Sequence, residues 1–148
     1  MQSFLSPIAT LIVGSAVAII AWQQWRVARD KLRLDLFDRR YKVFEATRKF
    51  LTMTVKKARF DDAQLFEFCA GIADAEFLFG NDVVDYLAQI RKRALEARAH
   101  HEELQSLPVG DERSRRVQAK TDQILWSGDQ LDLMIKTFSP YLNFSKVI

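Results

Sequence analysis

Apolar residues dominate the start of the chain, where the first twenty-five positions carry no charged side chain. A nearly unbroken apolar run extends from Ile8 to Trp25. A helix rises about 1.5 Å per residue, so roughly 20 apolar residues cross a hydrocarbon core of about 30 Å. Inside lipid a helix also satisfies its own backbone N–H and C=O groups, which no water can reach. The pattern predicts a transmembrane anchor over residues 1–25.

Beyond residue 25 the apolar positions recur three and four residues apart, which is typical of helices with one buried face. No glycine or proline lies between Gly14 and Gly71, so the first helix is expected to run on from the anchor to about Phe60. One apolar line comprises Leu34, Phe37, Tyr41, Phe44, Leu51 and Val55, and a second comprises Leu32, Leu36, Val43, Thr47, Phe50 and Thr54.

A second helix is predicted to begin after Asp61. This residue is a suitable N-cap, and Gln64 three positions later completes a capping box. The apolar pattern continues to Phe79, and Gly80 suits the left-handed turn that ends many helices. The sequence therefore predicts one helix between Asp61 and Gly80.

Two more helices follow the same logic. Asn81 can cap a third helix over residues 82–107, and a fourth begins near Asp111 after a Pro108–Gly110 break. The third presents Val83, Leu87, Ile90, Ala94, Ala97, His101 and Leu104, and the fourth presents Val117, Thr121, Ile124, Gly128, Leu131, Ile135 and Phe138. Pro140 is expected to end the fourth helix, so that Tyr141, Leu142 and Phe144 fold back over one end.

No alternating run of β-branched residues bounded by turns indicates a strand. Short connections between long amphipathic helices favour an antiparallel four-helix bundle. The chain is therefore predicted to be all-α, with an anchor over 1–25 that continues into a helical domain over 26–148. About 120 residues remain after the anchor, which is enough for one compact domain.

Charge is distributed unevenly. Seven Lys/Arg and three Asp/Glu lie in residues 26–42, and none precedes the apolar run. The positive-inside rule then places the N-terminus outside and the C-terminus in the cytoplasm. The residues expected at the membrane interface are Trp22, Trp25, Arg26, Arg29 and Lys31. Basic side chains there also attract anionic lipid headgroups.

From residue 43 onward fifteen Lys/Arg accompany sixteen Asp/Glu. A nucleic-acid-binding domain would be basic itself, so nucleic acid is not expected as a partner. A cleaved secretory signal is the alternative to an anchor. It needs a basic segment before the apolar run and small residues at its end, whereas here the charges follow the run and Trp-Gln-Gln-Trp closes it.

Small residues recur every four positions in the span, and they comprise Ser6, Thr10, Gly14 and Ala18, with Ala21 nearby. Such a stripe lets two helices approach closely in lipid. It predicts self-association or packing against another membrane protein.

Two arginines of the first helix, Arg33 and Arg40, lie between the two apolar lines. An unpaired buried charge costs several kcal/mol, so each needs a partner. Glu76 falls on the apolar stripe of the predicted second helix, and we expect it to pair with Arg40 inside the bundle. A lipid phosphate is the alternative partner for Arg33, which follows Trp25 by about two helical turns.

Chemistry has few candidates. Glu96, His100 and Glu103 share one helical face, which would suit a divalent metal, but metal-binding bundles draw such ligands from several helices. No phosphate-binding loop or nucleophile elbow is present in the sequence. Catalysis and a cofactor are therefore not expected.

Three blocks, KLRLDLFDRRYKVFEATRKFL, AEFLFGNDVVDYLAQIRKRA and FSPYLNFSK, carry a resemblance. With them the chain resembles a group of small bacterial proteins that have one N-terminal span and a helical cytoplasmic part. The resemblance implies a setting in the bacterial inner membrane and implies no catalytic residue.

Together these features predict a non-enzymatic, membrane-anchored scaffold or accessory subunit. A transmembrane sensor, in which the first helix carries a shift across the membrane, is one alternative. A metal-dependent bundle enzyme that uses the Glu96 face is another.

Overall fold

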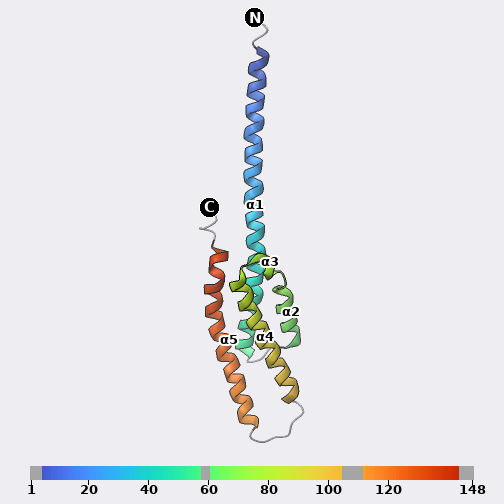
Figure 1. Cartoon of the computed structure of the whole chain (residues 1–148), viewed down its shortest axis with the longest axis vertical. Coiled ribbons are helices and arrows are strands. Elements are labelled where there is room, and N and C mark those ends of the chain that lie inside the picture. The colour runs from blue at the N-terminus through green and yellow to red at the C-terminus, as the bar shows by residue number, and fades with distance from the viewer. Residues whose placement is uncertain (1–4, 58–60, 105–111, 144–148) are drawn as a thin grey trace. The chain divides into compact units, whose positions relative to one another are not determined.

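A computed structural model describes the backbone over residues 5–57, 61–104 and 112–143, and the side chains over 10–57, 61–99 and 121–143. The elements are helices α1 (Leu5–Lys57), α2 (Asp62–Gly71), α3 (Ala75–Leu78), α4 (Asn81–Leu104) and α5 (Glu112–Leu142), labelled in Figure 1. The all-α prediction is thus confirmed for the described part of the chain. Two units are distinguished, Met1–Leu36 and Phe37–Ile148. The predicted boundary after Trp25 falls inside the first.

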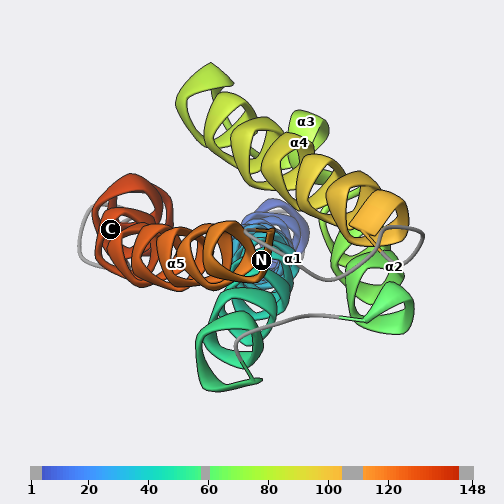
Figure 2. The ribbon, with the colours of Figure 1, turned by 90° about the horizontal axis from the view of Figure 1, so that it is seen from below.

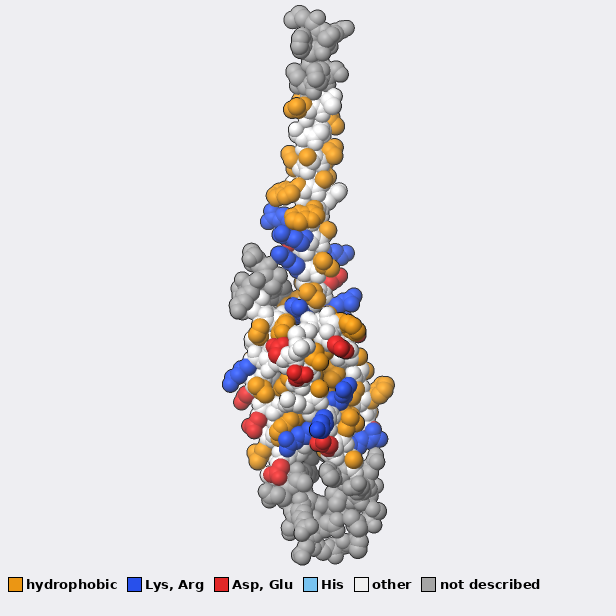
Figure 3. Space-filling model, viewed as in Figure 1, with side chains coloured by type: hydrophobic (Ala, Val, Ile, Leu, Met, Phe, Trp, Pro, Cys, Tyr) orange, Lys and Arg blue, Asp and Glu red, His pale blue; other side chains and the backbone are white. Residues whose placement is uncertain are grey.

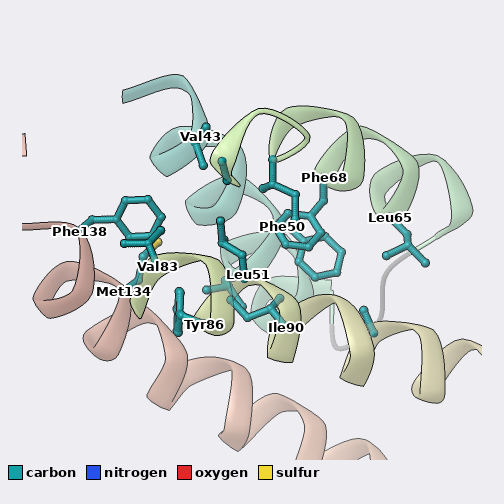
Figure 4. Packing of buried hydrophobic residues seen from close by; sticks show 14 residues of the cluster. Val43, Phe50, Leu51, Leu65, Phe68, Val83, Tyr86, Ile90, Met134 and Phe138 are labelled. Carbon is teal, nitrogen blue, oxygen red and sulfur yellow. The ribbon is translucent and has the colours of Figure 1, made fainter. Parts of the chain in front are cut away.

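One apolar core holds the second unit together. Its buried members are Val43, Phe50, Leu51, Leu65, Phe68, Ile72, Ala75, Val83, Tyr86, Leu87, Ile90, Ala94, Met134 and Phe138. Figure 4 shows these side chains converging, and Figure 2 shows their helices on different sides of it. Phe50 stacks on Phe68 with ring centroids 4.5 Å apart. Phe138 forms T-shaped contacts with Phe44 and Phe79, with ring centroids 5.5 and 5.2 Å apart. Such pairs add stability beyond their buried area.

Helix α1 contributes mainly the second of its two predicted apolar lines. Val43, Thr47, Phe50 and Thr54 of that line are buried, while its earlier members Leu32 and Leu36 are exposed. Of the first line Leu51 alone is buried, and Leu34 and Tyr41 are exposed. The Thr47 and Thr54 hydroxyls donate to the carbonyls of Val43 and Phe50 at 2.8 and 2.9 Å. Both buried hydroxyls are therefore satisfied within the helix, which removes the cost of an unpaired polar group.

The capping box before α2 is confirmed. The Asp61 carboxylate accepts a hydrogen bond from the Gln64 backbone N–H at 2.8 Å, and Gln64 Oε1 accepts one from the Asp61 backbone N–H at 3.2 Å. The predicted length is wrong. Helix α2 ends at Gly71, and a turn separates it from the short α3. A Cβ on Gly71 would lie 2.6 Å from Cβ of Ala46, so α2 approaches α1 more closely there than any side chain permits.

Helix α4 begins at Asn81, one residue before the predicted start. Val83, Leu87, Ile90 and Ala94 of its predicted face are all buried. Ala97 is half-buried, and the side chains of the remaining predicted positions, His101 and Leu104, lie outside the described residues.

The predicted face of α5 is only partly correct. Phe138 is buried as predicted, and Ile124, Gly128 and Leu131 are half-buried, but Thr121 and Ile135 are exposed. Helix α5 instead buries Ser127, Gln130 and Met134, which lie outside the predicted face. The Gln130 backbone carbonyl accepts a 2.7 Å hydrogen bond from the Tyr86 hydroxyl of α4. Polar residues thus take core positions on this helix, and a division into apolar and polar positions alone assigns its face incorrectly. Val117 lies outside the described side chains.

Helix α5 also continues through Pro140 to Leu142, so the predicted stop is wrong. A proline removes one i→i−4 hydrogen bond, here to the carbonyl of Lys136. Lys136 and Pro140 are both exposed, so water can donate a hydrogen bond to that carbonyl. Tyr141 and Leu142 are half-buried against the core as part of the helix, and Phe144 lies outside the described residues.

Candidate functional site

The N-terminal part of α1 exposes its apolar side chains. Every described side chain from residue 10 to residue 36 is exposed, including Leu11 at 72% and Ile20 at 53%. Figure 3 shows these hydrophobic side chains in orange, with basic ones in blue after them along the helix. In the described part of the chain, α1 is the one helix long and apolar enough to cross a membrane by length and composition.

The small-residue stripe lies within this segment. Thr10, Gly14, Ala18 and Ala21 are exposed, and the side chain of Ser6 is outside the described residues. A Cβ built on Gly14 would have nothing within 4 Å. The stripe therefore presents an open surface on which a second helix has room to pack, while its role in helix association stays a prediction.

Two arginines at the end of the apolar run contact the two tryptophans. The Arg26 guanidinium lies 5.9 Å from the Trp22 ring centroid, and that of Arg29 lies 5.1 Å from the Trp25 ring. Each pair is four residues apart, the spacing that brings side chains together on a helix. Such exposed cation–π contacts are worth about 0.5–1 kcal/mol. Lys31, also expected at the interface, is exposed. The four-residue spacing of both pairs is readable from the sequence.

Arg40 and Glu76 do not form the expected buried ion pair. The Glu76 side chain is exposed on α3. Arg40 is half-buried, and its Nε donates to the Leu78 carbonyl at 2.9 Å. Its Nη1 lies 3.5 Å from the Tyr141 carbonyl. The guanidinium is thus satisfied by backbone oxygens, and the interpretation of Glu76 as its partner is wrong.

Aromatic rings complete the surroundings of Arg40. Its guanidinium carbon lies 5.8 Å from the Phe79 ring centroid and 5.4 Å from that of Tyr141. Arg33, the other expected buried arginine, is exposed. Arg40 therefore joins α1 to the α3–α4 junction and to the end of α5, and its contacts are structural.

Tyr141 extends this cluster. Its hydroxyl donates to Asp82 at 2.7 Å and accepts from the Gly80 backbone N–H at 3.2 Å. The hydrogen bond to Asp82, together with burial, raises the pKa of Tyr141 above its usual value. A Cβ on Gly80 would lie 2.5 Å from the Tyr141 hydroxyl oxygen. Gly80 was expected to end a helix, but here its missing side chain makes room for the tyrosine.

The possible metal face lies largely outside the described side chains. Glu96 is exposed and lies 4.0 Å from the Lys92 ammonium, while the side chains of His100 and Glu103 are not described. Among the described residues no group of three His, Cys, Asp or Glu side chains is arranged to hold a metal ion. The metal hypothesis therefore gains no support from the described part of this face.

No protein-family model, no curated protein and no solved structure matches this chain.

Proposed function

We propose that this chain is a membrane-anchored, non-enzymatic helical adaptor of the bacterial inner membrane, which binds other membrane proteins. In this proposal the N-terminus lies outside the cell and residues 26–148 lie in the cytoplasm. The cytoplasmic part is an antiparallel four-helix bundle that continues from the anchor. Membrane lipid and a partner helix, either from another membrane protein or from a second copy, are the expected contacts.

The exposed apolar part of α1 carries the proposal. Burying a Val, Leu or Ile side chain is worth about 1.5–3 kcal/mol relative to leaving it in water. Leu11, Ile12, Val13, Val17, Ile19 and Ile20 are each more than half exposed. A lipid environment would remove the cost of this exposure. The Trp22–Arg26 and Trp25–Arg29 pairs suit the aqueous end of such a span, where amphipathic rings sit at headgroup depth.

Binding of other membrane proteins is supported by the open surface at Gly14. Helices in lipid associate by close packing rather than by the hydrophobic effect, and small residues permit that approach. The test is affinity capture of the full chain in mild detergent, followed by mass spectrometry. Gly14→Leu with Ala18→Leu blocks the stripe, and Ala16→Leu is the matched control because residue 16 lies on the opposite helical face.

We expect a stoichiometric membrane protein to copurify with the wild type and the A16L variant, and its yield to fall about tenfold, or by roughly 1.4 kcal/mol, with the double variant. Equal capture by the double variant would contradict the role of the stripe. Capture of no membrane protein by the wild type would contradict the adaptor function.

A second candidate is a signal transmitter, favoured by the bounds of α1. The same helix contains the apolar segment and, further along, the core residues Val43, Phe50 and Leu51. A transmitter requires this helix to stay unbroken. If the chain is a transmitter, amide hydrogen exchange of α4 should differ between bilayer and detergent, and a flexible Gly-Ser insertion after Leu34 should abolish that difference. If the chain is an adaptor, the same insertion should leave the captured partner protein unchanged.

A further inference from the structure

The surface around α3 is acidic. Residues 61–90 contain seven Asp/Glu and no Lys or Arg. On α2 two of these carboxylates have basic partners, because Glu67 lies 2.6 Å from Lys49 and Asp62 lies 3.0 Å from Arg98. Asp74 and Glu76, beside and within α3, are exposed, and the ion pairs found among the described side chains do not include them. Figure 3 shows acidic side chains, in red, gathered over α3 and the first turns of α4.

An aromatic side chain projects from the same short helix. Phe77 is 85% exposed and stands between Glu76 and the half-buried Leu78. A phenylalanine buries 150 Å² or more when it is covered, so a partner that covers Phe77 would gain apolar contact there. We call Asp74, Glu76 and Phe77 the acidic surface.

The chain also carries a surface of opposite charge. The α1 residues Arg29, Lys31, Leu32, Arg33 and Leu34, here called the basic stretch, are all exposed. Asp30, the one acid between them, lies 3.9 Å from Arg29, so the stretch keeps a net positive charge from Lys31 and Arg33. Leu32 is 70% exposed and Leu34 is 52% exposed. These leucines follow the predicted span, so lipid does not explain their exposure as it explains that of Leu11. The basic stretch thus offers apolar and positively charged side chains together.

We propose that the acidic surface of one copy binds the basic stretch of a second copy in the same membrane. This inference rests on the proposed function, because anchoring holds all copies in one orientation and raises their effective concentration. Arginine forms strong, often bidentate, hydrogen bonds to carboxylates, and Phe77 covers Leu34. The contact joins two different surfaces, so it generates a ring or a row of copies rather than a simple twofold dimer.

Site-specific cross-linking in native membranes tests this contact. Both copies carry Cys69→Ser, so that the one native cysteine cannot react. One tagged copy carries Phe77→Cys, and a second, differently tagged copy carries Leu34→Cys. Leu125→Cys replaces Phe77→Cys in the matched control, because Leu125 is also exposed, at 63%, but lies on α5.

We expect the Phe77→Cys pair to give at least about fivefold more cross-linked heterodimer than the control, a difference of roughly 1 kcal/mol in contact formation. Equal yields overturn the proposal. A cross-link from position 77 to a different protein, with none to the second copy, also overturns it, because the occupant is then another membrane protein.

Reversing the charges provides a second test of the same contact. Asp74→Lys with Glu76→Lys in the Phe77→Cys copy should lower the yield of cross-linked heterodimer to the control level. Lys31→Glu with Arg33→Glu in the other copy should restore it, and these changes leave Arg26 and Arg29 beside the span. All four side chains are exposed, so the fold is expected to survive their replacement. Absence of the loss or of the restoration contradicts the pairing.

Membrane fractionation in the same experiment separates the two proposals. Chains found in the membrane pellet without the cross-link overturn the self-contact and leave the anchored adaptor standing. Chains found in the soluble fraction overturn both.

Discussion

The Tyr141 hydroxyl donates a 2.7 Å hydrogen bond to the Asp82 carboxylate, across 59 positions of the chain. This bond ties the last turn of α5 to the first turn of α4. Arg40 stacks near the same tyrosine ring and bonds the Leu78 carbonyl, so α1 is joined to both. A small polar cluster therefore fixes how three segments of the helical unit meet, beside the apolar core.

Replacing Gly80 with alanine should destabilise the fold. The new Cβ would lie 2.5 Å from the Tyr141 hydroxyl oxygen and 3.0 Å from Oδ1 of Asp82. Overpacking of this kind costs about 1–3 kcal/mol. Gly128→Ala is the matched control, because a Cβ there meets nothing within 4 Å inside α5. It should stabilise by about 0.5–1 kcal/mol. Thermal melts of the full chain in detergent measure both.

The crowding at Gly80 depends on the tyrosine hydroxyl, and a double-mutant cycle isolates that dependence. Tyr141→Phe removes the oxygen that the new Cβ would meet, so Gly80→Ala should cost less in the Tyr141→Phe background. Residues in contact commonly show coupling of about 0.5–3 kcal/mol. Strictly additive melting shifts would show that Tyr141 does not occupy the space beside Gly80.

Arg40→Met should lower stability by about 1–2 kcal/mol, because the part-buried Leu78 carbonyl loses its side-chain donor. Arg33→Met and Glu76→Gln should each change it by less than about 0.5 kcal/mol, since both side chains are exposed. Denaturant unfolding of the full chain compares the three variants. If Glu76→Gln destabilised the fold as much as Arg40→Met, the two residues would be a pair after all.

The stability of the fold should fall at alkaline pH. Burial raises the pKa of Tyr86 well above its usual value of 10.0, and the bond to Asp82 raises that of Tyr141. The folded state therefore holds both phenolic protons more tightly than the unfolded state. This stabilisation is complete below the unfolded pKa of 10.0 and is lost as the pH rises through the folded-state values.

Tyr86→Phe tests that pH dependence. The variant should lose about 1 kcal/mol at neutral pH, because the hydrogen bond to the Gln130 carbonyl disappears. Its melting temperature should then fall less steeply than that of the wild type from about pH 9 upward. Parallel curves for the two proteins would argue that Tyr86 ionises alike in the folded and unfolded states.

Local signals predicted several features of the fold correctly. The Asp61–Gln64 capping box, the start of α4 to within one residue and the buried row that includes Ile90 all follow from short-range patterns. These patterns depend on residues within one or two turns, so they are readable without the tertiary structure. The apolar segment of α1 is also recognised from the sequence, because length and composition alone identify it.

The errors arise where distant contacts decide the outcome. Helix α2 ends at Gly71, where a Cβ would meet Ala46 of α1, and the sequence does not show that these two residues lie together. Helix α5 buries Gln130, whose backbone carbonyl accepts a hydrogen bond from the Tyr86 hydroxyl of α4. The partner of Arg40 is likewise a distant backbone group, the Leu78 carbonyl. Every residue has such a carbonyl, so the sequence does not indicate which one an arginine binds, and a carboxylate was the expected partner.

The most direct test of the account is alkaline carbonate extraction of membranes that contain the intact chain, with a reporter fused after Ile148. We expect the chain to stay in the membrane pellet and the reporter to be active on the cytoplasmic side only. Release of the intact chain into the supernatant, or reporter activity outside the cytoplasm, would contradict an N-terminal span that holds a cytoplasmic helical domain.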